Sequence, residues 1–113
     1  MMGEKQGHKS ALDWTETTFD AAHKGEFAEQ VHGHTWHVRI FWAAEPVRDA
    51  RFMHARLRQY LEAAFEHRLL DDVIAEPTNY GVAKALLQLM GDDITVIEVW
   101  RGGICPCGVR VER

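Results

Sequence analysis

The stretch HGHTWHVRIFW, residues 32–42, decides the fold class, because its apolar and polar residues alternate. Its large apolar side chains all fall on one face of an extended chain: Trp36, Val38, Ile40 and Trp42. Successive side chains of a strand point to opposite faces of a sheet, so the alternation predicts a half-buried strand. We therefore expect a sheet with one covered face and one open face.

Three further segments predict the other strands of this sheet. Residues 11–23 are rich in threonine and aromatic side chains, which favour a strand. Residues 94–100 and 109–112 predict a third and a fourth strand, with a glycine turn between them. Two strands therefore precede the middle of the chain and two follow it.

The middle of the chain predicts two helices. Apolar residues recur there at three- and four-residue spacing, first over 53–64 and then over 83–90. Asp49 is a suitable N-cap for the first helix, Pro77 interrupts the pattern, and Gly91 ends the second helix. The order ββααββ predicts an α+β fold, in which both helices cover one face of a four-stranded antiparallel sheet.

Length and charge limit the classes of protein to which the chain can belong. The 113 residues leave room for one domain, 1–113, small enough to gain from oligomerisation, and we expect residues 1–10 to be frayed. A formal net charge of −4 argues against nucleic acid as a partner. No apolar run is long enough to span a membrane, and the first residues lack the apolar region of a signal peptide. These features predict a cytoplasmic protein with no membrane partner.

Cys105 and Cys107 are the only cysteines of the chain, and a single residue separates them. A disulfide between such close neighbours would be strained, so the sequence predicts no disulfide framework. Two interpretations stay open: two thiols in a turn, or a pair with a metal-binding or redox role.

Three histidines are placed so that they could share one ligand. His32 and His34 flank Gly33 at the start of the second strand, and side chains two residues apart on an extended chain point to the same face. His23 ends the preceding strand, so pairing of the two strands would bring it near both. Three protein ligands and one open position are typical of a catalytic zinc site. The alternative is a pair of surface histidines at the start of a strand.

An ordered set of motifs resembles the 6-pyruvoyl-tetrahydropterin synthase family. The set consists of Phe19-Asp20-Ala21-Ala22-His23, His32-Gly33-His34, Phe65-Glu66-His67-Arg68-Leu69-Leu70, Pro77-Thr78 and Glu98. The resemblance implies a T-fold, in which three subunits join their sheets into a barrel and two such rings stack into a homo-hexamer. It also implies zinc bound by His23, His32 and His34, and a pterin-like ligand held by the carboxylate of Glu98, at a site formed between subunits. The alternative for Glu98 is an outward-facing residue of its strand.

The loop before the His-Gly-His motif differs from the family pattern, because it holds no cysteine where the family's synthases use one as a base. Glu29 stands three residues before His32, a spacing at which a variant branch of the family carries a glutamate as general base. The alternative for Glu29 is a solvated acid in a polar loop. Glu66 takes the place of the family's aspartate and precedes His67, with which it would form the supporting acid–base pair.

These observations lead to three functional hypotheses. The preferred one is a divergent member of the family that binds a pterin-like ligand and does not run the cysteine-dependent synthase reaction, since catalytic groups act as a unit and several have changed. The second is a zinc-dependent lyase that cleaves the side chain of dihydroneopterin triphosphate, with Glu29 as base. The third is metal handling without a pterin, by the histidines and the segment 105–107. Whether the chain is an enzyme stays open at this point.

Overall fold

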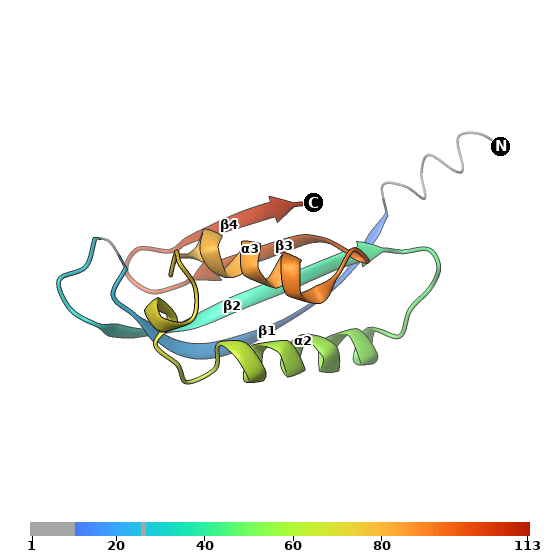
Figure 1. Ribbon diagram of the computed structural model, residues 1–113. Coiled ribbons are helices and arrows are strands. Elements are labelled where there is room, and N and C mark those ends of the chain that lie inside the picture. Colours follow the sequence, from blue (N-terminus) through green and yellow to red (C-terminus); the bar gives the residue numbers. More distant parts are fainter. Residues whose placement is uncertain (1–10, 26) are drawn as a thin grey trace.

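The computed structural model describes residues 11–25 and 27–113, so the expectation for residues 1–10 lies outside the described residues. The element order is the predicted one (Figure 1). The elements are β1 Leu12–His23, β2 His32–Ala43, α2 Ala50–Ala64, the short 3-10 helix η1 Leu70–Asp72, α3 Asn79–Met90, β3 Ile94–Arg101 and β4 Cys107–Glu112.

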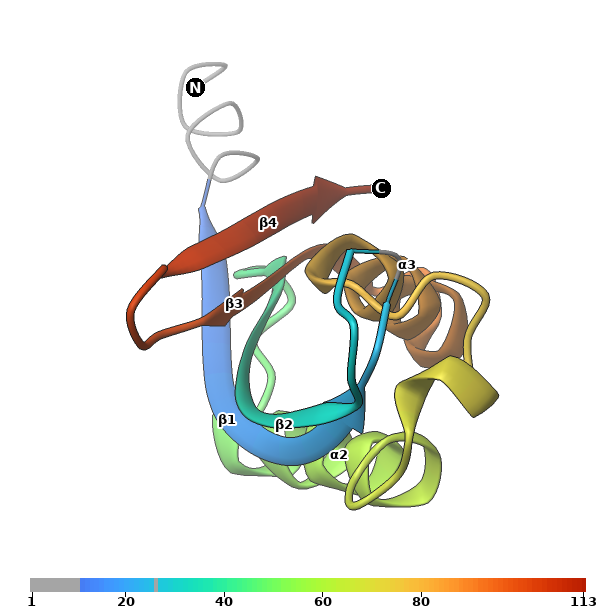
Figure 2. The same ribbon diagram turned by 90° about the vertical axis from the view of Figure 1, so that its left-hand side faces the viewer.

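The four strands form one antiparallel sheet in the order β1-β2-β3-β4. Helix α2 packs against β1, and α3 packs against β3 and β4 (Figure 2). The predicted apolar face of β2 is buried beneath the helices, since Trp36, Val38, Ile40 and Trp42 are all almost fully inaccessible to solvent. The α+β architecture, with four antiparallel strands and two helices, is therefore confirmed, and it is the arrangement of a T-fold.

The first two strands extend beyond the rest of the sheet at one end. β1 and β2 pair along their whole length, from Leu12 opposite Ala43 to His23 opposite His32. β3 pairs with β2 only from His37 onward. The residues of β2 before His37 therefore belong to a two-stranded extension, and this extension carries the histidines of the His-Gly-His motif.

Side-chain caps fix where both helices begin. Asp49 accepts a hydrogen bond from the amide of Arg51 at 2.9 Å, which confirms the predicted N-cap of α2. Thr78 caps α3 in the same way, with its hydroxyl oxygen 3.1 Å from the amide nitrogen of Gly81. Gly91 follows the last turn of α3 with a φ of 93°, a conformation that favours glycine. Among the described residues, no helix is long and apolar enough to cross a membrane.

Gly81 is required by a close approach of the backbone. A Cβ at this position would lie 1.6 Å from the carbonyl oxygen of Glu76, and a main-chain atom cannot move aside as a side chain can. We expect Gly81→Ala to lower the free energy of unfolding by about 2–3 kcal/mol, the upper part of the range for overpacking. Chemical denaturation measures this effect. Ala85→Gly in the same helix is the control, with an expected loss of only about 1 kcal/mol, and a Gly81→Ala protein as stable as the wild type would contradict the close approach.

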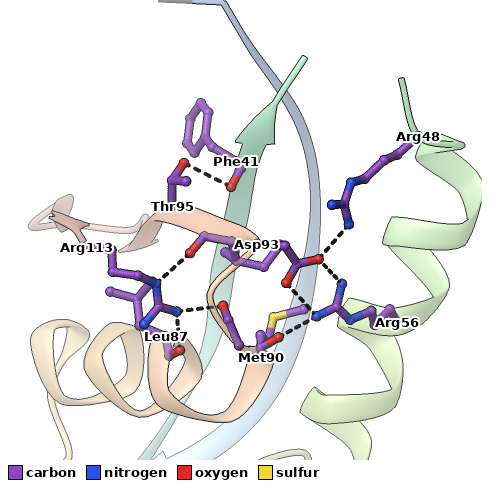
Figure 3. A network of polar contacts seen from close by, with 10 residues as sticks. Phe41, Arg48, Arg56, Leu87, Met90, Asp93, Thr95 and Arg113 are labelled. Carbon is purple, nitrogen blue, oxygen red and sulfur yellow. Dashed lines mark hydrogen bonds and ion pairs between the residues drawn. The ribbon is translucent and has the colours of Figure 1, made fainter. Parts of the chain in front are cut away.

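A polar network joins the start of α2 to the connection between α3 and β3 (Figure 3). Asp93 accepts hydrogen bonds from Arg48 at 2.8 Å and from Arg56 at 2.7 Å and 3.0 Å. Arg56 also donates to the carbonyl oxygen of Met90. The hydrogen bonds from Arg56 hold the pKa of Asp93 below its ordinary value, against the opposing effect of burial.

Asp93→Asn is expected to lower the free energy of unfolding by about 1–3 kcal/mol at neutral pH, because it weakens several charge-assisted hydrogen bonds. A carboxylate with a lowered folded-state pKa stabilises the fold above its unfolded pKa, near 3.8, and loses that effect as the pH falls through the folded pKa. The difference between wild type and variant should therefore shrink below about pH 4. Urea denaturation at several pH values tests this, with Asp92→Asn as control because the Asp92 side chain is fully exposed.

Candidate functional site

The pairing of β1 with β2 brings His23, His32 and His34 together. His23 lies directly opposite His32 in the register, and His34 lies opposite Ala21. One nitrogen from each of the three imidazoles falls within 4.8 Å of the other two. The ring centroids are 4.6 Å apart for His23 and His32, 5.0 Å for His23 and His34, and 4.7 Å for His32 and His34. This spacing allows all three side chains to reach one metal ion.

Backbone carbonyl groups orient two of these imidazoles. His23 Nδ1 lies 2.6 Å from the carbonyl oxygen of Pro77, and His32 Nδ1 lies 3.0 Å from that of Gln30. A carbonyl oxygen only accepts hydrogen bonds, so each Nδ1 carries a proton and Nε2 is the nitrogen left to bind a metal. Metal-binding histidines are commonly held in this way by an outer hydrogen bond.

The third imidazole leaves a buried nitrogen without a partner. His34 Nε2 has no hydrogen bond to any described residue, although it is shielded from solvent. Burial, and then the positive charge of Arg101, lower the pKa of His34 to about 4. Burial is also the largest cause of the lowered pKa of His23, against the opposing hydrogen bond to Pro77. Zn²⁺ binds the neutral form of imidazole, which the lowered pKa values of His23 and His34 favour. Together with the spacing of the three rings, this fits the metal that the resemblance implies.

Arg101 lies against this cluster, a feature that the sequence analysis missed. Its Nη1 is 3.2 Å from His23 Nε2, and its guanidinium carbon is 4.8 Å from the centre of the Trp36 ring. Ile97 and Val99 precede it on β3 and are fully buried against the helices, so alternation places Arg101 on the same face of the sheet. That alternation is readable in the sequence and could have identified the residue.

Glu98 lies on the opposite face of the sheet from the histidines. Within β3 it stands between the buried Ile97 and Val99, so its side chain projects away from the helices. There it accepts a hydrogen bond from Arg39 at 3.3 Å and another from Arg110 at 3.0 Å. Within one chain, the structure does not bring Glu98 to the histidine cluster, and its carboxylate is paired with two arginines.

Glu66 and His67 form a second group with Asp20. One ligand atom from each of these three side chains lies within 4.8 Å of the others. His67 has a φ of 60°, which is uncommon for a residue other than glycine, and its amide donates to the carbonyl oxygen of Asp20 at 2.7 Å. Residues held in such conformations often lie at functional sites.

The carboxylate of Glu66 is held by groups other than His67. One oxygen accepts a hydrogen bond from Arg58, and the other lies 3.1 Å from the amide nitrogen of Asp20. Burial raises the pKa of Glu66, but the hydrogen bonds from Arg58 and the Asp20 amide outweigh it, so the pKa lies below its ordinary value. Glu66 is therefore a fixed, ionised carboxylate near His67.

A shallow groove is lined by one residue of the histidine cluster and by two residues of the second group. Its volume is about 610 Å³, and it runs between the β1–β2 extension and the segment after α2. Its wall includes His34 and His67 together with Asp20, Gly33 and Thr35. The structure thus places a candidate metal ligand and a candidate acid–base residue in one groove.

Glu29 and the two cysteines lie outside this groove. Glu29 is exposed in the loop between β1 and β2, and it has no hydrogen bond or ion pair with any described residue. Cys105 and Cys107 are free and exposed, so they form no disulfide. Cys107 Sγ lies 3.4 Å from Asn79 Nδ2 and 3.5 Å from Arg101 Nη2.

The comparisons with known proteins bear on this arrangement of fold and site. A search of the curated proteins finds no matching sequence. The sequence model of the family described as 6-pyruvoyl tetrahydropterin synthase matches residues 14–101, which run from within β1 through β2 and both α-helices to the end of β3. The match spans most of the chain and contains the three histidines, Glu66 and His67. The chain therefore belongs to the 6-pyruvoyl tetrahydropterin synthase family.

Proposed function

We propose that the protein is a divergent member of its family that binds a pterin-like ligand at a zinc centre formed by His23, His32 and His34. The observation that carries the proposal is the convergence of three imidazoles, two of them oriented by backbone carbonyls. The loop that leads to His32 holds no cysteine, so the proposal excludes the cysteine-dependent synthase reaction. The homo-hexamer and the cytoplasmic location stay predictions.

The proposal assigns a different chemical role to the zinc site, to His67 and to Glu66. A zinc ion with three protein ligands keeps an open position and polarises an oxygen atom bound there. His67 lines the groove and is the residue that we assign to take or give a proton there. Glu66 is a poor base because both of its oxygens accept hydrogen bonds, and it serves instead as a fixed negative charge near His67.

A fluorescent pterin titrated against zinc-loaded and chelator-treated protein tests the binding role. We expect saturable binding by the zinc-loaded protein and binding at least about 10-fold weaker after the metal is removed, since the open zinc position would hold a ligand oxygen. Equal affinity of the zinc-loaded and the chelator-treated protein would show that pterin binding does not depend on a metal at the histidine cluster. No binding in either state would contradict the pterin proposal itself.

The lyase alternative rests on the position of Glu29. This carboxylate is free of hydrogen bonds to the described residues, and the next residue, Gln30, provides the carbonyl that orients His32. Because Glu29 lies outside the groove, this alternative requires its loop to bring the carboxylate to the bound ligand, where it would act as the general base. In the alternative, Glu29 moves the proton and His67 supports it.

Cleavage of dihydroneopterin triphosphate by the zinc-loaded protein distinguishes the two candidates. If the protein is this lyase, Glu29→Gln should lower kcat by about 100-fold or more, because a general base typically accelerates a reaction by at least that factor. Glu45→Gln in the next loop is the control, expected to leave the rate unchanged. A wild-type protein that binds a pterin but does not cleave this substrate would leave the binding role as the function.

A further inference from the structure

Arg101 brings a positive charge to the histidine cluster. It is the last residue of β3, and its Nη1 lies 3.2 Å from His23 Nε2. Its guanidinium lies over the ring of Trp36, which is fully buried beneath it. Stacking on an aromatic ring fixes the plane of a guanidinium and leaves its edge free for hydrogen bonds.

The guanidinium of Arg101 has no carboxylate partner among residues 11–25 and 27–113. Its hydrogen bonds go to His23 Nε2 and to Cys107 Sγ. The first partner is an imidazole nitrogen and the second a sulfur atom, which is a weak acceptor. Its Nε is buried and has no hydrogen bond to any described residue. By contrast, Arg39, Arg56 and Arg58 each pair with a carboxylate. Arg101 therefore retains a donor and a charge that the described part of the chain does not satisfy.

The acid that acts on His23 is paired with groups other than Arg101. Among the described residues, Asp71 is the acidic group whose charge raises the pKa of His23. Its two carboxylate oxygens accept hydrogen bonds from the amides of Lys24, at 2.7 Å, and Gly25, at 3.1 Å. Asp71 thus fixes the loop after β1 and forms no ion pair with Arg101 among the described residues.

We propose that Arg101 is an oxyanion-binding residue of the histidine site, and that it selects a ligand carrying a carboxylate or phosphate group. This inference rests on the proposed function. Once a metal takes the lone pair of His23 Nε2, Nη1 loses its acceptor and becomes available to the ligand. A guanidinium has only donors, so it matches the paired acceptor oxygens of such a group and cannot bond the N–H edge of an amino-pyrimidine ring. Arg101 therefore sets which substituent the ligand presents to the histidines.

Two fluorescent pterins that differ in one group provide the test: pterin-6-carboxylate and 6-hydroxymethylpterin, titrated against zinc-loaded protein. A charge-assisted bidentate pair corresponds to about 10- to 100-fold in affinity, so we expect the carboxylate to bind tighter by that factor. Arg101→Gln should abolish the difference, and Arg101→Lys should keep only part of it, because lysine retains the charge without the planar fork. Arg51→Gln is the charge-matched control, since the Arg51 side chain is 94% exposed on α2.

Calorimetric titration with inorganic phosphate distinguishes the two sources of the oxyanion. Phosphate binding that Arg101→Gln removes, without a preference for the carboxylate probe, would support a phosphate-bearing ligand. Equal binding of both pterins together with no Arg101-dependent phosphate binding would overturn the inference. If neither pterin binds, the proposed function fails, and the phosphate titration alone then decides whether Arg101 holds an oxyanion. Thermal unfolding of each variant, expected to match the wild type within a few degrees, excludes a simple folding defect.

Discussion

Replacing His34 by alanine is expected to lower the zinc affinity of the protein by about 100- to 1,000-fold, because one of the three ligands is lost and ligand bonds carry most of the binding free energy. His34 Nε2 is the buried imidazole nitrogen that has no other partner among the described residues, so the metal is the partner that the proposal supplies. Competition with a chromophoric chelator at neutral pH measures the change.

His37→Ala is the matched control for this experiment. His37 lies on the same strand, but on the opposite face, where its ring stacks on Trp100 at 5.2 Å. Its loss should leave zinc affinity within about 2-fold of the wild type, since it contacts none of the three ligands. If His34→Ala and His37→Ala had equal effects, the three-histidine site would be contradicted.

Trp36→Ala is expected to cause the largest loss of stability, about 3–5 kcal/mol in the free energy of unfolding. The ring is fully buried, stacks on Phe19 with centroids 5.9 Å apart, and donates its Nε1–H to the carbonyl oxygen of Ala21 at 3.1 Å. The substitution therefore leaves a large cavity and an unpaired carbonyl. Denaturation by urea, followed by circular dichroism, measures the loss.

Trp14→Ala provides the comparison for Trp36→Ala on the same sheet. Trp14 is 51% exposed on β1, and its main contact is with the guanidinium of Arg39, 4.5 Å from the ring centre. Such a partly exposed cation–π contact is worth about 1 kcal/mol or less. Comparable losses for the two tryptophans would show that the core is not centred beneath β2.

The architecture could be predicted from the sequence because local patterns determined each element. Alternation over residues 32–42 identified a half-buried strand, and helical spacing after Asp49 identified a helix whose N-cap is that residue. The predicted break at Pro77 falls in the turn between η1 and α3. These signals depend on residues close in sequence, so they can be recognised without knowledge of the tertiary structure.

The histidine cluster could also be anticipated, because its geometry follows from two paired strands. His23 was expected to lie near His32 and His34 on the assumption that β1 and β2 are neighbours, and the register places His23 opposite His32. The orienting carbonyl of Pro77 could not be anticipated. It lies 54 residues from His23 in the sequence and reaches it only through the packing of the segment before α3.

The other site residues show where sequence reasoning stops. Glu98 was assigned through the resemblance alone and its role stays a prediction, since the alternation of β3 places it on the face opposite the histidines of its own chain. Arg101, three residues later, lies on the histidine side. The supporting role of Glu66 beside His67 stays a prediction, and the hydrogen bonds of its oxygens to Arg58 and to the amide of Asp20 could not be foreseen. Such long-range competition between hydrogen-bond partners leaves no local pattern.

The most direct test of the central claim is the metal content of tag-free protein purified without chelator, measured by elemental mass spectrometry. The proposal predicts near-stoichiometric zinc per subunit in the wild type and little zinc in His34→Ala. Wild-type protein without zinc, even after zinc is added back and excess removed, would contradict a metal centre at His23, His32 and His34.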